Sequence, residues 1–282
     1  MITYWQAIWL ALLQGLTEFL PVSSSGHLAI AGMLFHINTD VGPLFDVLLH
    51  VGTLLAVCAV YYKDVWVLIR EVVLLVVDGI RYLVNRTKNP FRMYRERLLA
   101  LYVILASVPT AIIGLLVQKF LEDLFLSSLT AVGCALLITA AILFLSKKIQ
   151  AGTKQLEDMK IRDVLTIGTV QGFATIPGIS RSGSTIVTEF AAGLNPEFAV
   201  EFSFLISLPA IAGAALLNLL DAGFDSFAVN AGPYLVGILI AAVSGYLCIR
   251  FLLRILKRGK FYYFGYYCAA IGLVAVIAGF FI

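Results

Sequence analysis

Two short segments of this 282-residue chain combine serine, glycine and a basic side chain in a pattern that suits the binding of an anion. The first, Ser-Ser-Ser-Gly at 23–26, precedes His27, and the second reads Ser-Arg-Ser-Gly at 180–183. Each is expected to begin a short helix, whose first backbone N–H groups lack partners and carry the positive end of the helix dipole. The serines could instead serve only as helix caps. Two such turns meeting at one place, together with an arginine, favour a site for two linked phosphates.

A glutamine and a glutamate precede the first turn. Gln14 and Glu18 are four residues apart and therefore share one face of a helix. Glu18 with phosphate oxygens could hold Mg²⁺, which commonly takes one or two carboxylates, substrate phosphates and water. Gln14 could add a neutral carbonyl ligand or a hydrogen bond. Glu18 could also pair with Arg181, and the two roles are compatible.

His27 lies at the start of the short helix after the first turn. The helix dipole disfavours a protonated ring there, which leaves a neutral imidazole that can attack phosphorus or accept a proton. A purely structural histidine is the alternative. His50 follows Asp46 by four residues and is expected to support the site from a second layer, whereas His36 is expected to be structural.

The composition predicts an all-α integral membrane protein. Hydrophobic residues make up 61% of the chain and charged residues 13%, and the mean hydropathy is +0.96. A soluble fold could not cover so much apolar surface. Continuous apolar runs of roughly 20 residues are the length that crosses a bilayer as a helix. The net charge of +3 is too small to indicate nucleic-acid binding.

Six apolar stretches are long enough to be transmembrane helices, near 43–62, 98–118, 129–146, 198–220, 233–253 and 261–282. Three basic connections, 63–97, 147–162 and 250–260, hold 18 of the 20 lysines and arginines. The positive-inside rule makes these connections cytoplasmic. Residues 64–84, apolar but interrupted by charges, are placed at the cytoplasmic interface.

Two further apolar segments, 1–36 and 164–194, are broken midway by proline, glycine and serine. Their second halves are too short to cross, so each segment is expected to form a re-entrant helix-loop-helix hairpin. A shift of 157 residues aligns 14–27 with 171–184 without a gap, and five of the 14 positions are identical. The chain is thus predicted to be a single membrane domain, 1–282, of two inverted-topology repeats, about 1–146 and 158–282, whose hairpin tips meet near mid-membrane.

Arg181 is the basic residue that this topology places at bilayer depth. An arginine there costs roughly 2.5–3.5 kcal/mol, so it should face a polar cavity and a negative partner. Phosphate fits the planar guanidinium particularly well. The alternative is an ion pair with one of four acids, Glu18, Asp46, Glu189 or Glu201.

The remaining polar residues are given supporting roles. Glu189, Glu197 and Glu201 are expected to make polar contacts around the second hairpin. Four tyrosines between 262 and 267 lie beside basic residues and predict an interfacial belt without a catalytic role. The four cysteines stand singly in apolar stretches and are expected to behave as small hydrophobic residues.

At these residues the chain resembles the undecaprenyl-diphosphate phosphatase family, also known as bacitracin-resistance proteins. The family's first motif, [EQ]xxxE followed by PVSS[ST]GH, matches 14–18 and 21–27, and its second, PGxSRSGxT, matches 177–185. The resemblance runs nearly end to end. It implies a multi-pass enzyme of the bacterial cytoplasmic membrane that removes the terminal phosphate from undecaprenyl diphosphate at an outward-facing site, aided by Mg²⁺ or Ca²⁺. Such an enzyme recycles the lipid carrier for peptidoglycan synthesis and confers bacitracin resistance.

The resemblance also implies roles for single residues. Glu18 would hold the metal, Arg181 would bind the diphosphate, and Ser24 and His27 are the candidates for nucleophile or base. Many relatives carry Glu where this chain has Gln14, so Gln14 is expected only to assist the metal or a water. The preferred hypothesis has His27 activating Ser24 or a water, while the metal and Arg181 neutralise developing charge; direct attack by His27 is the alternative. The other groups expected to bind the diphosphate are Ser23, Ser25, Gly26, Ser180, Ser182, Gly183 and Thr185.

Three other functions fit parts of the pattern. A secondary transporter or flippase of a polyprenyl phosphate lipid would also use inverted repeats with broken helices. Lipid phosphatases of the acid-phosphatase type share the S-G-H and S-R strings, but this chain lacks their upstream K-x₆-R-P element and a suitably placed second histidine. A structural scaffold would leave Arg181 and Glu18 buried without a purpose. The expected partners are the lipid substrate and membrane lipids, and the oligomeric state is left open, with a homodimer as one alternative.

Overall fold

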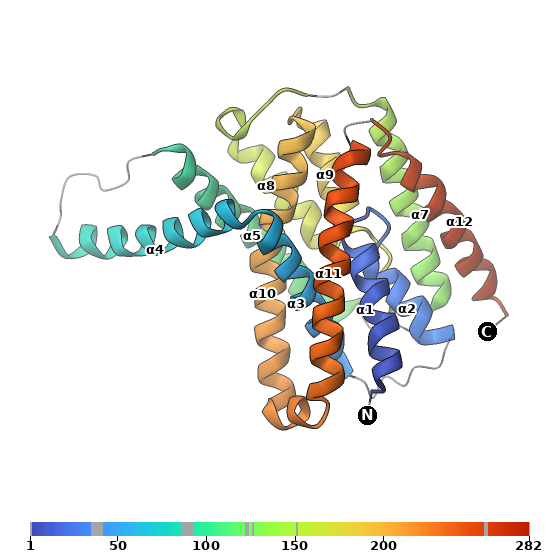
Figure 1. The fold of residues 1–282 in the computed structure, drawn as a ribbon. Coiled ribbons are helices and arrows are strands. Elements are labelled where there is room, and N and C mark those ends of the chain that lie inside the picture. The colour runs from blue at the N-terminus through green and yellow to red at the C-terminus, as the bar shows by residue number, and fades with distance from the viewer. Residues whose placement is uncertain are drawn as a thin grey trace.

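The protein is helical throughout the part of the chain that the computed structural model describes, which is residues 2–34, 42–85, 93–121, 124–125, 127–150, 152–256 and 259–281. Within these ranges the only β-type pairing is an isolated bridge between Lys154 and Leu194. The predicted all-α class is therefore confirmed (Figure 1). The elements are α1 (Tyr4–Glu18), α2 (Ser24–Leu34), α3 (Gly42–Val60), α4 (Tyr62–Asn85), α5 (Arg95–Phe120), α7 (Leu129–Leu145), η2 (Ser146–Lys148), η3 (Leu156–Asp158), α8 (Ile161–Phe173), α9 (Arg181–Ala191), α10 (Pro196–Val229), α11 (Ala231–Leu256) and α12 (Tyr263–Ala278).

Four of the six expected crossings are helices long and apolar enough to span a membrane, namely α5, α7, α10 and α11. The expected crossing near 43–62 is α3, which passes that test only together with α4, and these two helices are bent by 99°. The expected crossing near 261–282 is α12, a shorter apolar helix of 16 residues. The described chain thus has four candidate spans, or five if the bent pair is one span, as befits a multi-pass membrane protein.

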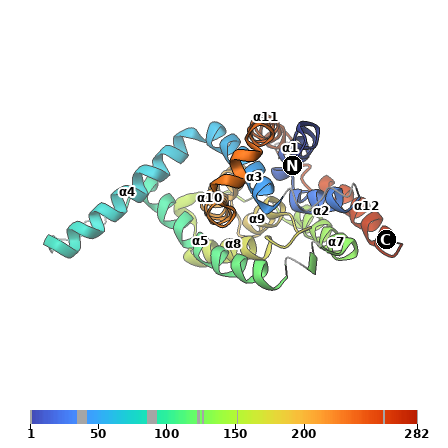
Figure 2. The same cartoon turned by 90° about the horizontal axis from the view of Figure 1, so that it is seen from below.

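Helix α4 points away from the helical body (Figures 1 and 2). It exposes large apolar side chains, among them Trp66 and Leu83. Its polar side is tied to the start of α5: Arg97 lies 2.8 Å from the Asp78 carboxylate, and the Tyr94 hydroxyl donates a hydrogen bond to Glu71. A helix with one exposed apolar side suits the predicted interfacial position of 64–84.

The second helices of the two hairpins have the same boundaries under the shift of 157 residues. Helices α2 and α9 begin 157 residues apart and also end 157 residues apart. A Cβ atom added to Gly15 of α1 would lie 2.0 Å from the Ser244 hydroxyl of α11, and one added to the equivalent Gly172 of α8 would lie 2.7 Å from Ile113 of α5. Each hairpin therefore packs closely against a long helix from the other half of the chain. The division of the chain into two inverted-topology repeats stays a prediction.

The same register continues into the helix that follows each hairpin. Phe45 of α3 and Phe202 of α10 are 157 residues apart and both fully buried. Leu48 and Leu205 have the same spacing and are also in the core. Helices α2 and α9 lie near the centre of the molecule when it is viewed from below (Figure 2). The core thus forms around the hairpins and holds their break points inside the protein.

Gly168 is predicted to be essential to the packing of α8 on α5. A Cβ at this position would lie 2.2 Å from the backbone oxygen of Ala106, so the two helices would have to separate. We expect Gly168→Ala to lower the free energy of unfolding by about 1–3 kcal/mol, measured by thermal denaturation in detergent. Gly213→Ala in α10 is the control, since nothing lies within 4 Å of its added Cβ. Equal melting temperatures for the two variants would refute this close packing.

Candidate active site

The turns of the two hairpins touch each other. A Cβ on Gly26 would lie 2.9 Å from the Cα of Gly178, and a Cβ on Gly183 would lie 3.1 Å from the Cβ of Pro21. The shift of 157 residues converts one of these contacts into the other, so the turns meet with an approximate two-fold relation. Glycine is required at 26 because the Gly178 backbone occupies the space of a side chain. The expected convergence of the two turns is confirmed.

Equivalent serines cap the second helix of each hairpin. The Ser23 hydroxyl accepts a hydrogen bond from the Gly26 N–H at 3.2 Å, and the Ser180 hydroxyl accepts one from the Gly183 N–H at 3.1 Å. Ser23 also adopts a left-handed backbone conformation, with φ of +68°, which is uncommon for a residue other than glycine and is enriched at functional sites. Both serines thus act as helix caps, and their contact with a ligand stays a prediction.

Glu18 joins the two hairpins through a set of polar contacts. One carboxylate oxygen, Oε1, accepts a hydrogen bond from Arg181, and the other, Oε2, accepts one from the Ser24 hydroxyl. The Gln14 amide also donates to Oε2 at 3.0 Å, and Nε2 of His50 lies 3.6 Å from it. Glu18 and Arg181 therefore share one site, as the sequence predicted, and His50 supports it.

The two charges of this pair differ in their access to a ligand. The Glu18 side chain is 4% exposed and the Arg181 side chain 21%. A buried carboxylate is tolerated because a cation and several hydrogen bonds compensate its lost hydration. The arginine is reachable, and its planar fork has five N–H donors that suit phosphate oxygens. An incoming anion can therefore compete with Glu18 for Arg181.

The two hairpins have matching second helices, but their turns differ, since φ is +68° at Ser23 and −74° at the equivalent Ser180. They also differ in chemistry. Under the shift of 157 residues, Thr175 stands at the position of Glu18, Arg181 at that of Ser24, and Ser184 at that of His27. The first hairpin thus contributes the carboxylate, the hydroxyl and the imidazole, while the second contributes the guanidinium. A ligand bound between the hairpins would therefore contact the carboxylate, hydroxyl and imidazole on one side and the guanidinium on the other.

His27 is held by two hydrogen bonds that define its tautomer. Its Nδ1 lies 2.8 Å from the backbone oxygen of Ser23, which can only accept, so Nδ1 carries the proton. Its Nε2 lies 2.9 Å from the Tyr267 hydroxyl and accepts from it, and the two rings stack with centroids 5.6 Å apart. The bound proton of the Ser24 hydroxyl points to Glu18, which makes Glu18 the base that this geometry offers to Ser24.

Sequence reasoning missed Tyr267. It was expected in an interfacial belt, yet its hydroxyl contacts His27 across 240 residues of chain. Tyr266 beside it is exposed as well, and its ring packs edge-on against Phe144. No motif near Tyr267 signals the contact, because it arises only from the packing of α12 against the rest of the fold.

We expect Tyr267→Phe to lower kcat/KM for phosphate release about 5-fold, because the variant lacks one hydrogen bond that positions the imidazole. Steady-state assays of the purified variant measure this directly. Tyr266→Phe is the matched control and should stay within about twofold of the wild-type rate. A Tyr267→Phe variant as active as Tyr266→Phe would remove Tyr267 from the site.

Two other residues of the predicted site are engaged within the protein. The Thr185 hydroxyl lies 2.5 Å from that of Ser203 on α10 and donates to the Arg181 backbone oxygen at 2.9 Å. The Ser182 hydroxyl lies 3.4 Å from both the Ser180 hydroxyl and the Leu20 backbone oxygen. These contacts join α9 to α10 and to the first hairpin, and direct binding of a ligand by either residue stays a prediction.

The supporting acids do not gather around Arg181. Glu189 of α9 is fully buried, and neither of its carboxylate oxygens has a hydrogen-bond partner within the described residues. Glu197 and Glu201 share one face of α10, as expected, but they line a separate pocket. His36 lies outside the described residues.

A divalent cation fits this site only with help from a ligand. Across the described ranges, no three histidine, cysteine or acidic side chains gather closely enough to hold a metal by themselves. Glu18 supplies one carboxylate, and the buried Oε1 of Gln14 has no hydrogen-bond partner. These two oxygens suit Mg²⁺ or Ca²⁺ if phosphate oxygens and water complete the coordination.

Comparisons with known proteins give a consistent result. Residues 7–274 match the family model described as bacitracin resistance protein BacA. A protein of Alkaliphilus metalliredigens named undecaprenyl-diphosphatase is 41% identical over 281 residues, which is 98% of each chain. Proteins with the same name from Desulforapulum autotrophicum and Methanosphaera stadtmanae are 42% and 38% identical, over 98% and 96% of each chain.

Proposed function

Because the chain belongs to the bacitracin resistance protein BacA family, we propose that it dephosphorylates its substrate where Glu18, Ser24 and Arg181 meet. The chain is a phosphatase of undecaprenyl diphosphate, which releases inorganic phosphate and leaves undecaprenyl phosphate for renewed use as a lipid carrier. The observation that carries the proposed site is the contact between Glu18 of one hairpin and Arg181 of the other.

Binding begins with an exchange of partners at Arg181. The terminal phosphate takes hydrogen bonds from the Arg181 fork in place of Glu18, because two phosphate oxygens match the guanidinium geometry. The remaining phosphate oxygens accept hydrogen bonds from backbone N–H groups at the starts of α2 and α9 and from the hydroxyls of Ser25 and Ser182. The apolar tail stays among the membrane-facing helices.

The exchange leaves Glu18 beside the hydroxyl of Ser24. The Ser24 oxygen attacks the terminal phosphorus, and its proton passes to Oε2 of Glu18, with which it is already hydrogen-bonded. The bond from that phosphorus to the bridging oxygen breaks, and undecaprenyl phosphate leaves with the electron pair. Arg181 stabilises the charge on the transferred phosphoryl group.

Water then releases phosphate from Ser24. The neutral Nε2 of His27 accepts a proton from this water once Tyr267 yields its hydrogen bond, and the water oxygen bonds to the phosphorus. The bond from that phosphorus to the Ser24 oxygen breaks, and Glu18 returns its proton to the Ser24 oxygen. In two alternatives, His27 attacks the phosphorus itself or water attacks without a covalent intermediate. Trapping with ³²P-labelled substrate separates them: an acid-stable phosphoserine supports Ser24, an acid-labile phosphohistidine supports His27, and solvent ¹⁸O in phosphate without a phosphoenzyme supports water.

A cation held by Glu18 and the Gln14 carbonyl would supply Lewis-acid stabilisation of the phosphate charge when bound. We therefore expect a chelator to lower phosphate release by purified protein at least about 10²-fold, and added Mg²⁺ to restore it. The assay uses polyprenyl diphosphate in detergent. Full activity in the presence of the chelator would contradict the proposed requirement for a cation. Tight lipid binding with no phosphate release would favour the transporter alternative.

The proposed topology follows from the charge distribution. The three basic connections, 63–97, 147–162 and 250–260, face the cytoplasm. With six crossings, two re-entrant hairpins and repeats of opposite orientation, the Glu18 site opens to the outside of the cytoplasmic membrane. This placement fits a phosphatase that acts on a lipid diphosphate left there after its cargo has been transferred.

A further inference from the structure

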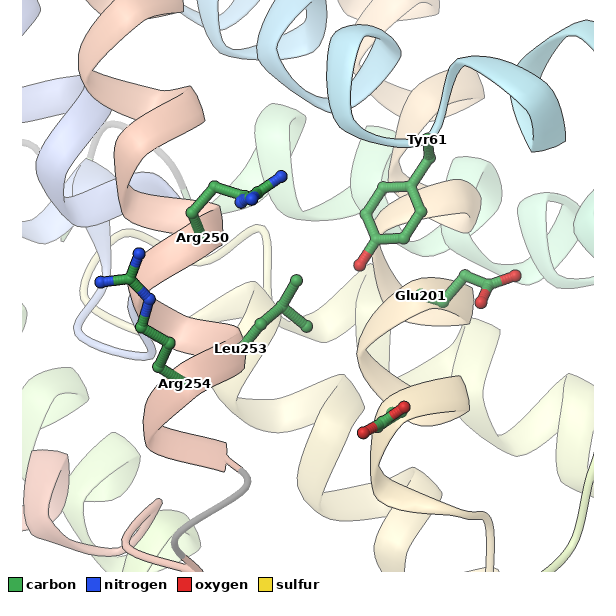
Figure 3. Close-up of a pocket in the computed structure, with 6 residues that line it drawn as sticks. Tyr61, Glu201, Arg250, Leu253 and Arg254 are labelled. Carbon is green, nitrogen blue, oxygen red and sulfur yellow. The ribbon is translucent and has the colours of Figure 1, made fainter.

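A charged pocket of about 380 Å³ lies between α10 and α11, and no residue of the hairpin turns lines it. Arg250 and Arg254 come from α11, Glu197 and Glu201 from α10, and Tyr61 from the bend between α3 and α4; Leu253 completes the lining. Figure 3 shows the α11 side chains on one side, Glu201 on the other, and the Tyr61 ring between the two helices. The pocket thus presents two guanidinium groups opposite two carboxylates.

An apolar groove continues this pocket along the same face of α11. The groove has a volume of about 350 Å³ and is lined by Leu55, Ala56, Ala59, Ala242, Val243, Tyr246 and Leu247. Tyr246 and Leu247 precede Arg250 by about one helical turn, and the Arg250 guanidinium lies 6.0 Å from the centre of the Tyr246 ring. On α3, Ala59 stands two residues before Tyr61. Groove and pocket are therefore neighbours on both helices.

This surface is separate from the Glu18 site. The opposite face of α11 packs on the first hairpin, where Ser244 meets Gly15 and the Cys248 thiol lies 3.3 Å from the Leu16 backbone oxygen. None of these residues lines the charged pocket or the apolar groove. A ligand on this surface would leave the substrate site unblocked.

We propose that the charged pocket and the apolar groove together bind a membrane phospholipid whose headgroup carries both a phosphate and a primary ammonium. The phosphate fits Arg250 and Arg254 as a charge-assisted acceptor, and the ammonium fits the Glu197 and Glu201 side as a donor. An acyl chain occupies the groove. A headgroup with negative charge alone would face the two carboxylates, and a quaternary ammonium has no N–H to donate.

Native mass spectrometry tests this proposal with purified, delipidated protein. The protein is titrated with phosphatidylethanolamine, phosphatidylcholine and phosphatidylglycerol of identical acyl chains. We expect phosphatidylethanolamine to bind about 5-fold more tightly than either of the others, as one or two charge-assisted hydrogen bonds would give. Equal binding of phosphatidylcholine, or stronger binding of phosphatidylglycerol, would overturn the proposal.

Variants locate the lipid. The double variant Arg250→Gln/Arg254→Gln should lose the preference for phosphatidylethanolamine, while Lys147→Gln/Lys148→Gln, on another basic connection, should keep it. Ala59→Trp should weaken the binding of all three lipids without changing the order of their affinities, because the indole fills the groove. Phosphate release by each variant should remain within about twofold of wild type, which also shows that it is folded. A preference that survives Arg250→Gln/Arg254→Gln, or binding unaffected by Ala59→Trp, would refute the site.

Discussion

Replacing Arg181 by alanine should lower kcat/KM for phosphate release by about 10²–10³-fold, the usual cost of removing one donor that stabilises transition-state charge. The loss follows from the position of Arg181, which is the first residue of α9. Its guanidinium pairs with Glu18 and remains partly exposed to an incoming phosphate. Release of ³²P from labelled polyprenyl diphosphate by purified protein measures it.

Arg181→Lys separates charge from geometry in the same experiment. Lysine keeps the positive charge but lacks the planar fork, so its activity should lie between those of the wild type and the alanine variant. Because Arg181→Ala leaves the buried Glu18 carboxylate without its cation, the melting temperature in detergent must be measured alongside. A folded Arg181→Ala variant with activity near that of the wild type would show that Arg181 does not bind the diphosphate.

Replacing Glu18 by glutamine should lower the same rate constant by about 10²–10⁴-fold, the range typical of a lost general base. Glutamine has nearly the same shape and can still accept a hydrogen bond from Ser24, so the change removes charge and basicity rather than volume. Both the proposed proton transfer from Ser24 and the proposed cation contact depend on that charge.

Glu189→Gln is the matched control for this substitution. Glu189 is also a fully buried acid on a hairpin helix, but its carboxylate has no hydrogen-bond partner among the residues described. Its phosphate release should stay within about twofold of wild type. A Glu18→Gln enzyme that retains wild-type activity would show that the Glu18 carboxylate is not the base. Equal losses in both variants would show that burial rather than chemistry explains the effect.

The sequence predicts the two broken segments and the meeting of Glu18 with Arg181 at one site, because both follow from strong local physics. Clustered proline, glycine and serine in the middle of an apolar run favour a helix break, and the breaks at 19–23 and 174–180 are observed. A single proline does not suffice, since Pro109 and Pro209 lie inside α5 and α10. A single arginine within apolar sequence requires a negative partner, which restricted the choice to a few acids. Glu18 is one of the four acids that the sequence offers as a partner for Arg181.

Other features depend on packing that no local pattern records. Tyr267 reaches His27 only because α12 lies against the helices around the first hairpin. The preference of Ser24 for Glu18 depends on the turn geometry set by Ser23, whose left-handed backbone is unusual for serine. The bend at Tyr61 likewise separates α3 from α4 without a proline or glycine to signal it.

A double-mutant cycle on Glu18 and Arg181 tests most directly whether the two hairpins form one catalytic site. The values of kcat/KM for phosphate release are compared for wild type, Glu18→Gln, Arg181→Gln and the double variant. If both residues serve one phosphate, their losses are strongly non-additive, and the double variant should be within about threefold of the slower single variant. Losses that multiply, as for independent positions, would contradict a shared diphosphate site.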